Sequence, residues 1–143
     1  MKKDNILEVK GLHKRFTSKG ITVKAVTDVS FSVKPGETIG IVGESGCGKT
    51  TLGRCIVRAY NASEGEVFYR TKNGEELDFL KADKKKMKEI RKEIQMIFQD
   101  PYSSLDPRMT VLDIIKEPLK ANFPNMSKAE MDQKAKAMAR RWA

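Results

Sequence analysis

Residues 43–50 read Gly43-Glu44-Ser45-Gly46-Cys47-Gly48-Lys49-Thr50, and this stretch decides the fold class. It matches the pattern G-x-x-x-x-G-K-[ST], whose glycines let backbone amide groups turn towards a phosphate. The nearly all-apolar run Thr38–Val42 precedes it and is typical of a strand buried on both faces. Apolar residues at spacings of three and four follow it and predict a helix that ends near Asn61. This order of strand, loop and helix predicts an α/β fold with a phosphate-binding loop.

The side chains of this loop suit a nucleoside triphosphate. Lys49 supplies a positive charge for the β and γ phosphates, the Thr50 hydroxyl can ligate Mg²⁺, and Thr51 is placed to bond the α phosphate. The phosphates would also meet the positive end of the following helix. A chance glycine turn with a capping lysine is disfavoured, because the strand and the helix agree with the motif. We expect nucleotide to block alkylation of the Cys47 thiol.

The segments before the loop predict two strands. Apolar and polar residues alternate from Ile6 to Phe16, and β-branched residues are frequent from Ile21 to Val33. A turn over 18–20 joins the two segments, and Pro35-Gly36 makes the turn after the second.

After the loop, three short elements are predicted. Glu66–Arg70 with a turn at Asn73-Gly74 indicates a hairpin. A charged helix with apolar residues at helical spacing is predicted over 83–92. Ile94–Phe98 predicts a further strand.

Two capping boxes predict helices in the last third of the chain. Thr110 with Asp113 opens one helix, which Pro118 must end or kink. Ser127 with Glu130 opens another. The second helix carries an apolar stripe for which the sequence shows no partner: Met131, Ala135, Met138 and Trp142.

Composition excludes several classes of protein. The net charge is +9, but residues 61–143 carry 17 basic against 14 acidic side chains, so we expect no nucleic-acid partner. No apolar run approaches the roughly 20 residues of a membrane span, and the start lacks the pattern of a secretory signal, so we expect the chain in the cytosol. Two cysteines with one histidine fit neither a disulfide framework nor a zinc site.

Beyond the loop, several segments resemble the nucleotide-binding subunits of ABC transporters. The long block Met96–Val111 narrows the resemblance to the ATP-binding subunits of oligopeptide and dipeptide importers. The likeness covers the whole of this chain, but this chain corresponds to only part of the family's domain. The segments that carry it are Leu12–Phe16, Ala25–Phe31, Gly36-Glu37, Val42–Thr51 and Met96–Val111.

The resemblance implies roles for individual residues. Phe16 falls where the family places an aromatic ring that stacks on adenine, and its alternative is an ordinary core residue. Gln99 matches the glutamine of the loop before the helical subdomain, which can ligate Mg²⁺ or orient water. Lys49 and Gln99 are then the expected catalytic residues, and Thr50 and Gln99 the expected Mg²⁺ ligands. The expected nucleotide-binding set is Phe16, Gly43, Glu44, Ser45, Gly46, Cys47, Gly48, Lys49, Thr50 and Thr51.

Asp100 is an alternative to this assignment, as the acid of a second nucleotide-binding motif. That motif is an apolar strand that ends in Asp. Gln99 interrupts the apolar run and Pro101 follows Asp100 at once, so this reading is disfavoured.

The resemblance also implies an organisation and partners. Residues 1–100 would form part of a P-loop ATPase core with an antiparallel β subdomain, and residues 101–143 a coupling loop and the start of a helical subdomain. Tyr102 and Leu105 would lie against transmembrane permease subunits. A second ATP-binding subunit, identical or paralogous, is expected, and the protein would be peripheral at the cytoplasmic face of the membrane.

Three parts of the family pattern are missing. The chain has no serine-glycine-glycine-glutamine signature, no apolar strand ending in Asp-Glu and no later histidine, because His13 is its only histidine. We therefore expect an N-terminal part of a longer subunit that does not hydrolyse ATP alone. The alternative function is a stand-alone small P-loop NTPase or kinase, although the Asn-Lys-x-Asp motif of a GTPase is absent.

Overall fold

The computed structural model describes residue 2 and residues 4–100 and 105–141. These residues form two compact units, 1–96 and 97–143, which are described separately below.

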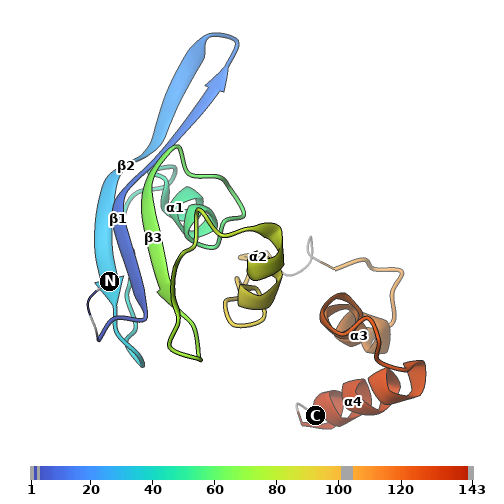
Figure 1. Ribbon diagram of the computed structural model, residues 1–143. Helices are drawn as coiled ribbons and strands as arrows, with labels where there is room; N and C mark the ends of the chain where they lie inside the picture. Colours follow the sequence, from blue (N-terminus) through green and yellow to red (C-terminus); the bar gives the residue numbers. More distant parts are fainter. Residues whose placement is uncertain (1, 3, 101–104, 142–143) are drawn as a thin grey trace. The chain divides into compact units, whose positions relative to one another are not determined.

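The first unit is built on a four-stranded antiparallel sheet with the strand order β2-β1-β3-β4 (Figure 1). Its strands are β1 (Leu7–Ser18), β2 (Ile21–Val33), β3 (Glu64–Arg70) and β4 (Glu76–Asp78). The two strands predicted before the loop and the hairpin predicted at Glu66–Arg70 are confirmed. Their turns are set by nearest neighbours, which is why local sequence was enough to find them.

β1 and β2 extend beyond the rest of the sheet as a two-stranded ribbon (Figure 1). β3 pairs with β1 no further along than His13, whereas β1 pairs with β2 as far as Ser18. Phe16 therefore lies in the ribbon, opposite Val23 of β2.

α1 (Lys49–Ile56) packs against this sheet and buries Leu52 and Cys55. The helix ends five residues before the predicted end at Asn61. Arg58 adopts a left-handed φ of 54°, which takes the backbone out of the helix. The unit's core joins residues of the sheet, of the turn after β4, of α1 and of α2: Val9, Leu12, Val26, Leu52, Cys55, Val67, Tyr69, Phe79, Met87 and Ile90.

α2 (Lys84–Ile90) confirms the predicted charged helix. The carboxylate of Asp83 caps it by accepting a hydrogen bond from the Lys86 backbone N–H at 2.7 Å. Met87 and Ile90 lie on its buried face, so the apolar spacing in the sequence corresponds to the core side of the helix.

Two predicted strands are wrong. Neither Thr38–Val42 nor Ile94–Phe98 forms a strand, and Val42 and Ile97 are 92% and 97% exposed. A strand needs a hydrogen-bonded neighbour, and the four strands of the described sheet pair only with one another. The 38–42 run instead lies along a hollow of about 650 Å³ that it shares with apolar residues of β2.

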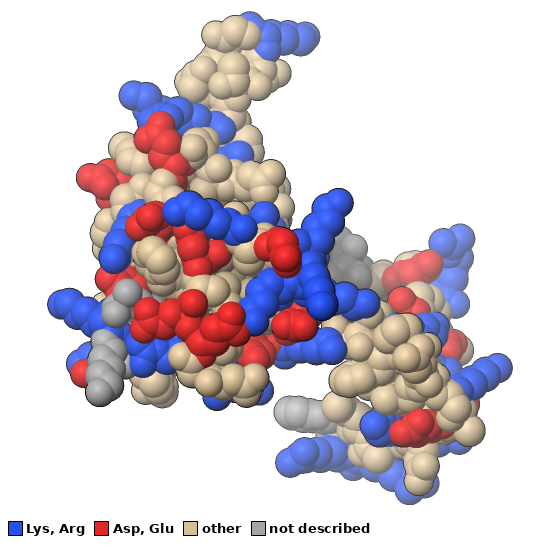
Figure 2. Space-filling view, viewed as in Figure 1, with Lys and Arg blue, Asp and Glu red and all other residues tan. Residues whose placement is uncertain are grey.

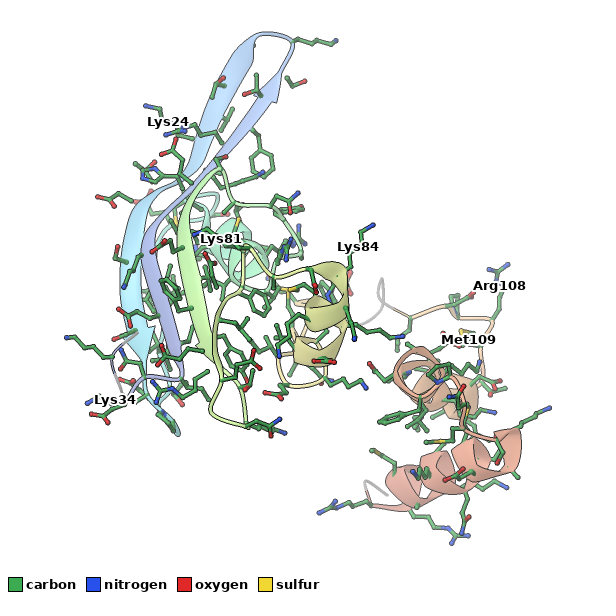
Figure 3. All side chains as sticks on the ribbon, in the orientation of Figure 1. Lys24, Lys34, Lys81, Lys84, Arg108 and Met109 are labelled. Carbon is green, nitrogen blue, oxygen red and sulfur yellow. The ribbon has the colours of Figure 1, made fainter. Side chains whose placement is uncertain are left out.

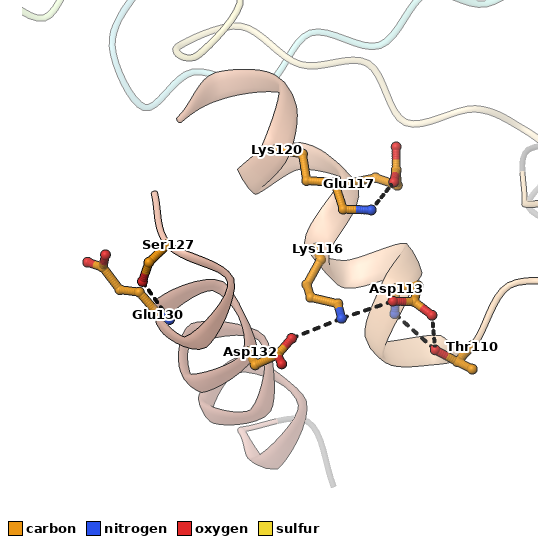
Figure 4. A network of polar contacts seen from close by, with 8 residues as sticks. All are labelled: Thr110, Asp113, Lys116, Glu117, Lys120, Ser127, Glu130 and Asp132. Carbon is orange, nitrogen blue, oxygen red and sulfur yellow. Dashed lines mark hydrogen bonds and ion pairs between the residues drawn. The ribbon is translucent and has the colours of Figure 1, made fainter. Parts of the chain in front are cut away.

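The second unit contains α3 (Val111–Asn122) and α4 (Lys128–Arg140), which pack against each other. Both predicted N-caps are confirmed. The Thr110 hydroxyl accepts from the Asp113 N–H at 3.2 Å, and the Ser127 hydroxyl accepts from the Glu130 N–H at 3.3 Å (Figure 4). Pro118 lies inside α3 and does not end it: the helix continues to Asn122.

Lys116 joins the two helices of this unit. Its ammonium group lies 2.9 Å from a carboxylate oxygen of Asp113 in α3 and 2.9 Å from one of Asp132 in α4 (Figure 4). The Thr110 hydroxyl, which donates to the Asp113 carboxylate, and then Lys116 lower the pKa of Asp113. Lys116 lowers the pKa of Asp132, and the two carboxylates raise the pKa of Lys116. Ala135 is fully buried, so the expectation that the α4 stripe lacks a partner is wrong for this residue; Trp142 lies outside the described residues.

Candidate phosphate-binding site

The loop before α1 owes its conformation to glycine. Gly46 and Gly48 have φ values of 80° and 100°, which L side chains rarely adopt. Gly48 also touches the neighbouring strand, since a Cβ atom built there would lie 2.1 Å from the backbone oxygen of Ala25 in β2. The glycine thus lets the loop lie directly against the sheet, which places the first turn of α1.

The beginning of α1 has no internal partner for its amide groups. Gly48 is the N-cap and makes no side-chain cap hydrogen bond, and the first turn carries no acidic residue. The first N–H groups of a helix have no partner within the helix, so those of Lys49, Thr50 and Thr51 point out of its positive end. This end of α1 is suited to accept an anion.

The Lys49 ammonium group is held within the loop. It donates to the backbone oxygens of Gly43 at 2.7 Å and Glu44 at 2.6 Å. It also lies 3.6 Å from the sulfur of Cys47. The loop backbone therefore holds the positive charge of the residue that begins α1.

The two cysteines differ in environment. Cys47 is exposed in the loop, whereas Cys55 is buried in α1. Burial raises the pKa of the Cys55 thiol above its ordinary value. A thiol reagent therefore reaches Cys47 first.

Phe16 presents an aromatic ring in the same unit. Its side chain is 40% exposed, so the reading as an ordinary core residue does not hold. Phe16 pairs with Val23, two residues along β2 from Ala25, where the loop meets the strand. At the rise of a strand this separation is about 7 Å. The rings of Phe16 and Tyr60 make a T-shaped contact, with centroids 5.7 Å apart.

The remaining predicted site residues lie elsewhere. Gln99 belongs to the second unit, in a segment without helix or strand, and its side chain is exposed. The structure therefore does not join Gln99 to the loop within one compact unit. Leu105 is 48% exposed, in agreement with an exposed position, and Tyr102 lies outside the described residues.

Sequence reasoning missed Lys14 and Tyr60, which contact Phe16. A signal for Lys14 was present, because residues two apart on a strand share a face. No comparable signal existed for Tyr60, which reaches Phe16 only through the packing of the segment after α1.

Charges of both signs are mixed over the surface of the first unit (Figure 2). Lys86 pairs with Glu75, and Lys81 lies 2.9 Å from Asp78. Figure 3 shows Lys24 on β2 and Lys84 at the start of α2. None of the helices within the described ranges is long and apolar enough to cross a membrane. Those same ranges contain no cluster of three His, Cys, Asp or Glu side chains placed to hold a metal ion.

Comparison with known proteins agrees with this geometry. Residues 26–142 match the family model described as ABC transporter. The oligopeptide transport ATP-binding protein OppF of Bacillus subtilis is 50% identical over 131 residues, which are 92% of this chain and 42% of that protein. OppF of Haemophilus influenzae is 52% identical over 86% of this chain and 36% of its own length. The chain thus spans about two fifths of these relatives.

Solved structures confirm the predicted P-loop NTPase fold of the ABC type. The ATP-binding cassette MJ0796, solved as a dimer in a post-hydrolysis state with ADP and Pi, matches with a TM-score of 0.70 and 26% identity. The match covers 90% of this chain and 53% of that one.

Proposed function

Because the chain belongs to the ABC transporter family, we propose that it is the phosphate-binding part of an ATP-binding subunit that powers an oligopeptide importer. One observation carries the proposal: the Lys49 ammonium group and the uncapped start of α1 converge at one glycine loop. The importer class is supported by the names of the OppF relatives. A stand-alone small P-loop NTPase or kinase is not favoured, since relatives of this similarity carry transport names.

The loop would bind the triphosphate by exchanging partners. Phosphate oxygens would take the place of the backbone oxygens of Gly43 and Glu44 as acceptors for the Lys49 ammonium group. The amide groups that begin α1 would donate to the same phosphates. Binding would therefore break the two hydrogen bonds that hold Lys49 to the loop backbone.

Mg²⁺ fits the residues at the start of α1. Thr50 is exposed there and would contribute its hydroxyl as a ligand. The further oxygen ligand that the family resemblance implies is the side-chain amide of Gln99. Bound Mg²⁺ supplies charge neutralisation at the β and γ phosphate oxygens. Thr51 would bond the α phosphate, and Gln99 would also orient the attacking water.

The base would stack on Phe16. The ring is exposed and lies about 7 Å along the sheet from the loop's contact with β2, so one nucleotide could reach both. Stacking on an aromatic face contributes about 1–3 kcal/mol per base in proteins that bind single strands. Phe16 would therefore add affinity for the base and none for the phosphates.

Calorimetry tests the nucleotide site. Lys49→Ala should abolish ATP–Mg²⁺ binding, and Phe16→Ala should weaken ATP while inorganic triphosphate binds nearly as before. Lys84→Ala is the matched control, because Lys84 is an exposed lysine of α2 and its loss changes the net charge equally. Unchanged ATP affinity in Lys49→Ala would show that the loop is not the site.

The proposed partners are a second ATP-binding subunit and transmembrane permease subunits. The dimeric state of MJ0796 supports the first, and the exposed Leu105 supports a contact with the second. The protein would then lie peripherally at the cytoplasmic face of the membrane. Crosslinking from Leu105→Cys in the assembled importer tests this arrangement, and a crosslink to the subunit's own body alone would contradict it.

A further inference from the structure

Lys14 covers one face of the Phe16 ring. Its ammonium group lies 4.7 Å from the ring centroid, within the range of a cation–π interaction. The two residues are two apart on β1, which puts their side chains on the same face of the sheet.

A second contact holds the Lys14 ammonium group in place. It donates to the backbone oxygen of Asn61 at 2.8 Å. Within the described residues Lys14 makes no ion pair with a carboxylate; besides the ring and this carbonyl, its charge acts on the buried thiol of Cys55. The carbonyl fixes the position of the charge relative to the ring.

Phe16 also contacts the ring of Tyr60. Tyr60 meets the ring at an interplanar angle of 87°, and the Tyr60 hydroxyl accepts a hydrogen bond from Arg54 of α1 at 2.7 Å. Arg54 also lies over the Tyr60 ring at 5.3 Å. Phe16 thus contacts Lys14 on one face and the perpendicular ring of Tyr60, while 40% of its surface stays exposed.

We propose that Lys14 is a positioning residue for the nucleotide base, an inference that rests on the proposed function. It occupies one face of Phe16 and leaves the opposite face for adenine. A cation behind the ring draws π electrons towards itself, so the open face repels the electron-rich base less. The bracing also limits rotation of the ring, which lowers the entropy lost when the base stacks.

The test compares ATP with inorganic triphosphate in the 143-residue chain by calorimetry. Lys14→Met removes the charge and keeps the length of the side chain, and Lys14→Gln provides a second neutral variant should the first fail to fold. We expect Kd for ATP to rise about threefold, as for an exposed cation–π contact, while Kd for triphosphate is unchanged. Lys14→Arg keeps the cation and should bind ATP as the parent does.

The Phe16→Ala background provides the discriminating control. If Lys14 acts through the ring, Lys14→Met should have no further effect on ATP binding once the ring is gone. An equal loss of ATP and triphosphate affinity would show that Lys14 acts on the phosphates instead. ATP affinity that is unchanged or greater in Lys14→Met would overturn the inference.

The same experiments separate this inference from the proposed function. ATP binding that is unaffected by Lys49→Ala would contradict the proposed function. ATP binding that is lost in Lys49→Ala but unchanged in Lys14→Met would contradict the positioning role alone.

Discussion

Replacing Gly48 by alanine tests the contact that places the phosphate-binding loop on the sheet. The added Cβ would lie 2.1 Å from the backbone oxygen of Ala25, whereas real Cβ contacts stay beyond 3.0 Å. The loop or β2 must therefore move by almost 1 Å. Because the obstacle is a backbone carbonyl, no side-chain rotation can relieve it.

The magnitude follows from three contributions. A left-handed backbone destabilises an alanine by about 1–2 kcal/mol. Alanine also reduces the conformational freedom of the unfolded chain, which offsets about 0.4–1 kcal/mol of this loss. Overpacking of a close contact adds about 1–3 kcal/mol. We therefore expect Gly48→Ala to lower the free energy of unfolding by roughly 2–4 kcal/mol in urea titrations followed by circular dichroism.

Gly20→Ala is the matched control. Gly20 also has a left-handed φ, 79°, but nothing lies within 4 Å of the position its Cβ would take. Gly20→Ala should lower the free energy of unfolding by only about 1 kcal/mol, because it carries the backbone cost without the steric clash. Gly48→Ala should also bind inorganic triphosphate more weakly than Gly20→Ala, since the start of α1 is displaced. Equal stability and equal triphosphate affinity in the two variants would refute the reasoning.

Three further outcomes are expected. Maleimide should modify Cys47 well before the buried Cys55, and ATP–Mg²⁺ should slow the reaction at Cys47. Mass spectrometry of peptides measures both effects. Equal rates of modification at the two cysteines would contradict the site geometry. Burial and the hydrogen bond to Glu93 raise the pKa of Tyr69 to about 12 from 10.0. The free energy of unfolding should therefore fall as pH rises from 10 to 12. Urea titrations across that window should show a shallower fall for Tyr69→Phe. The 143-residue chain should release no phosphate from ATP at a steady rate, because the signature and the Asp-Glu strand are absent from it, and turnover that Lys49→Ala abolishes would contradict this.

Local patterns in the sequence predicted elements whose stability depends on near neighbours. The ends of β2 at Ile21 and Val33 agree with the prediction to the residue. Thr110 and Ser127 cap their helices as predicted, because a capping hydrogen bond spans three residues. The contacts that stabilise such elements lie within a short stretch of chain.

Patterns whose outcome depends on distant partners were misread. Thr38–Val42 has the composition of a buried strand, but a strand forms only where another segment accepts and donates its hydrogen bonds. Ala135 was expected to lack a partner, yet α3 packs against α4. The end of α1 was placed too late because the left-handed turn at Arg58 leaves no mark in the apolar spacing.

The sequence by itself determined the phosphate-binding loop, since its glycines, Lys49 and Thr50 stand consecutively and their chemistry is local. Only the tertiary structure decided what surrounds the base-stacking residue. Tyr60 and the carbonyl of Asn61 are more than 40 positions from Phe16 and Lys14, and they meet because the segment after α1 packs back against β1. Residue types limit which contacts are favourable, but packing decides which of them form, because burial and distance depend on the whole fold.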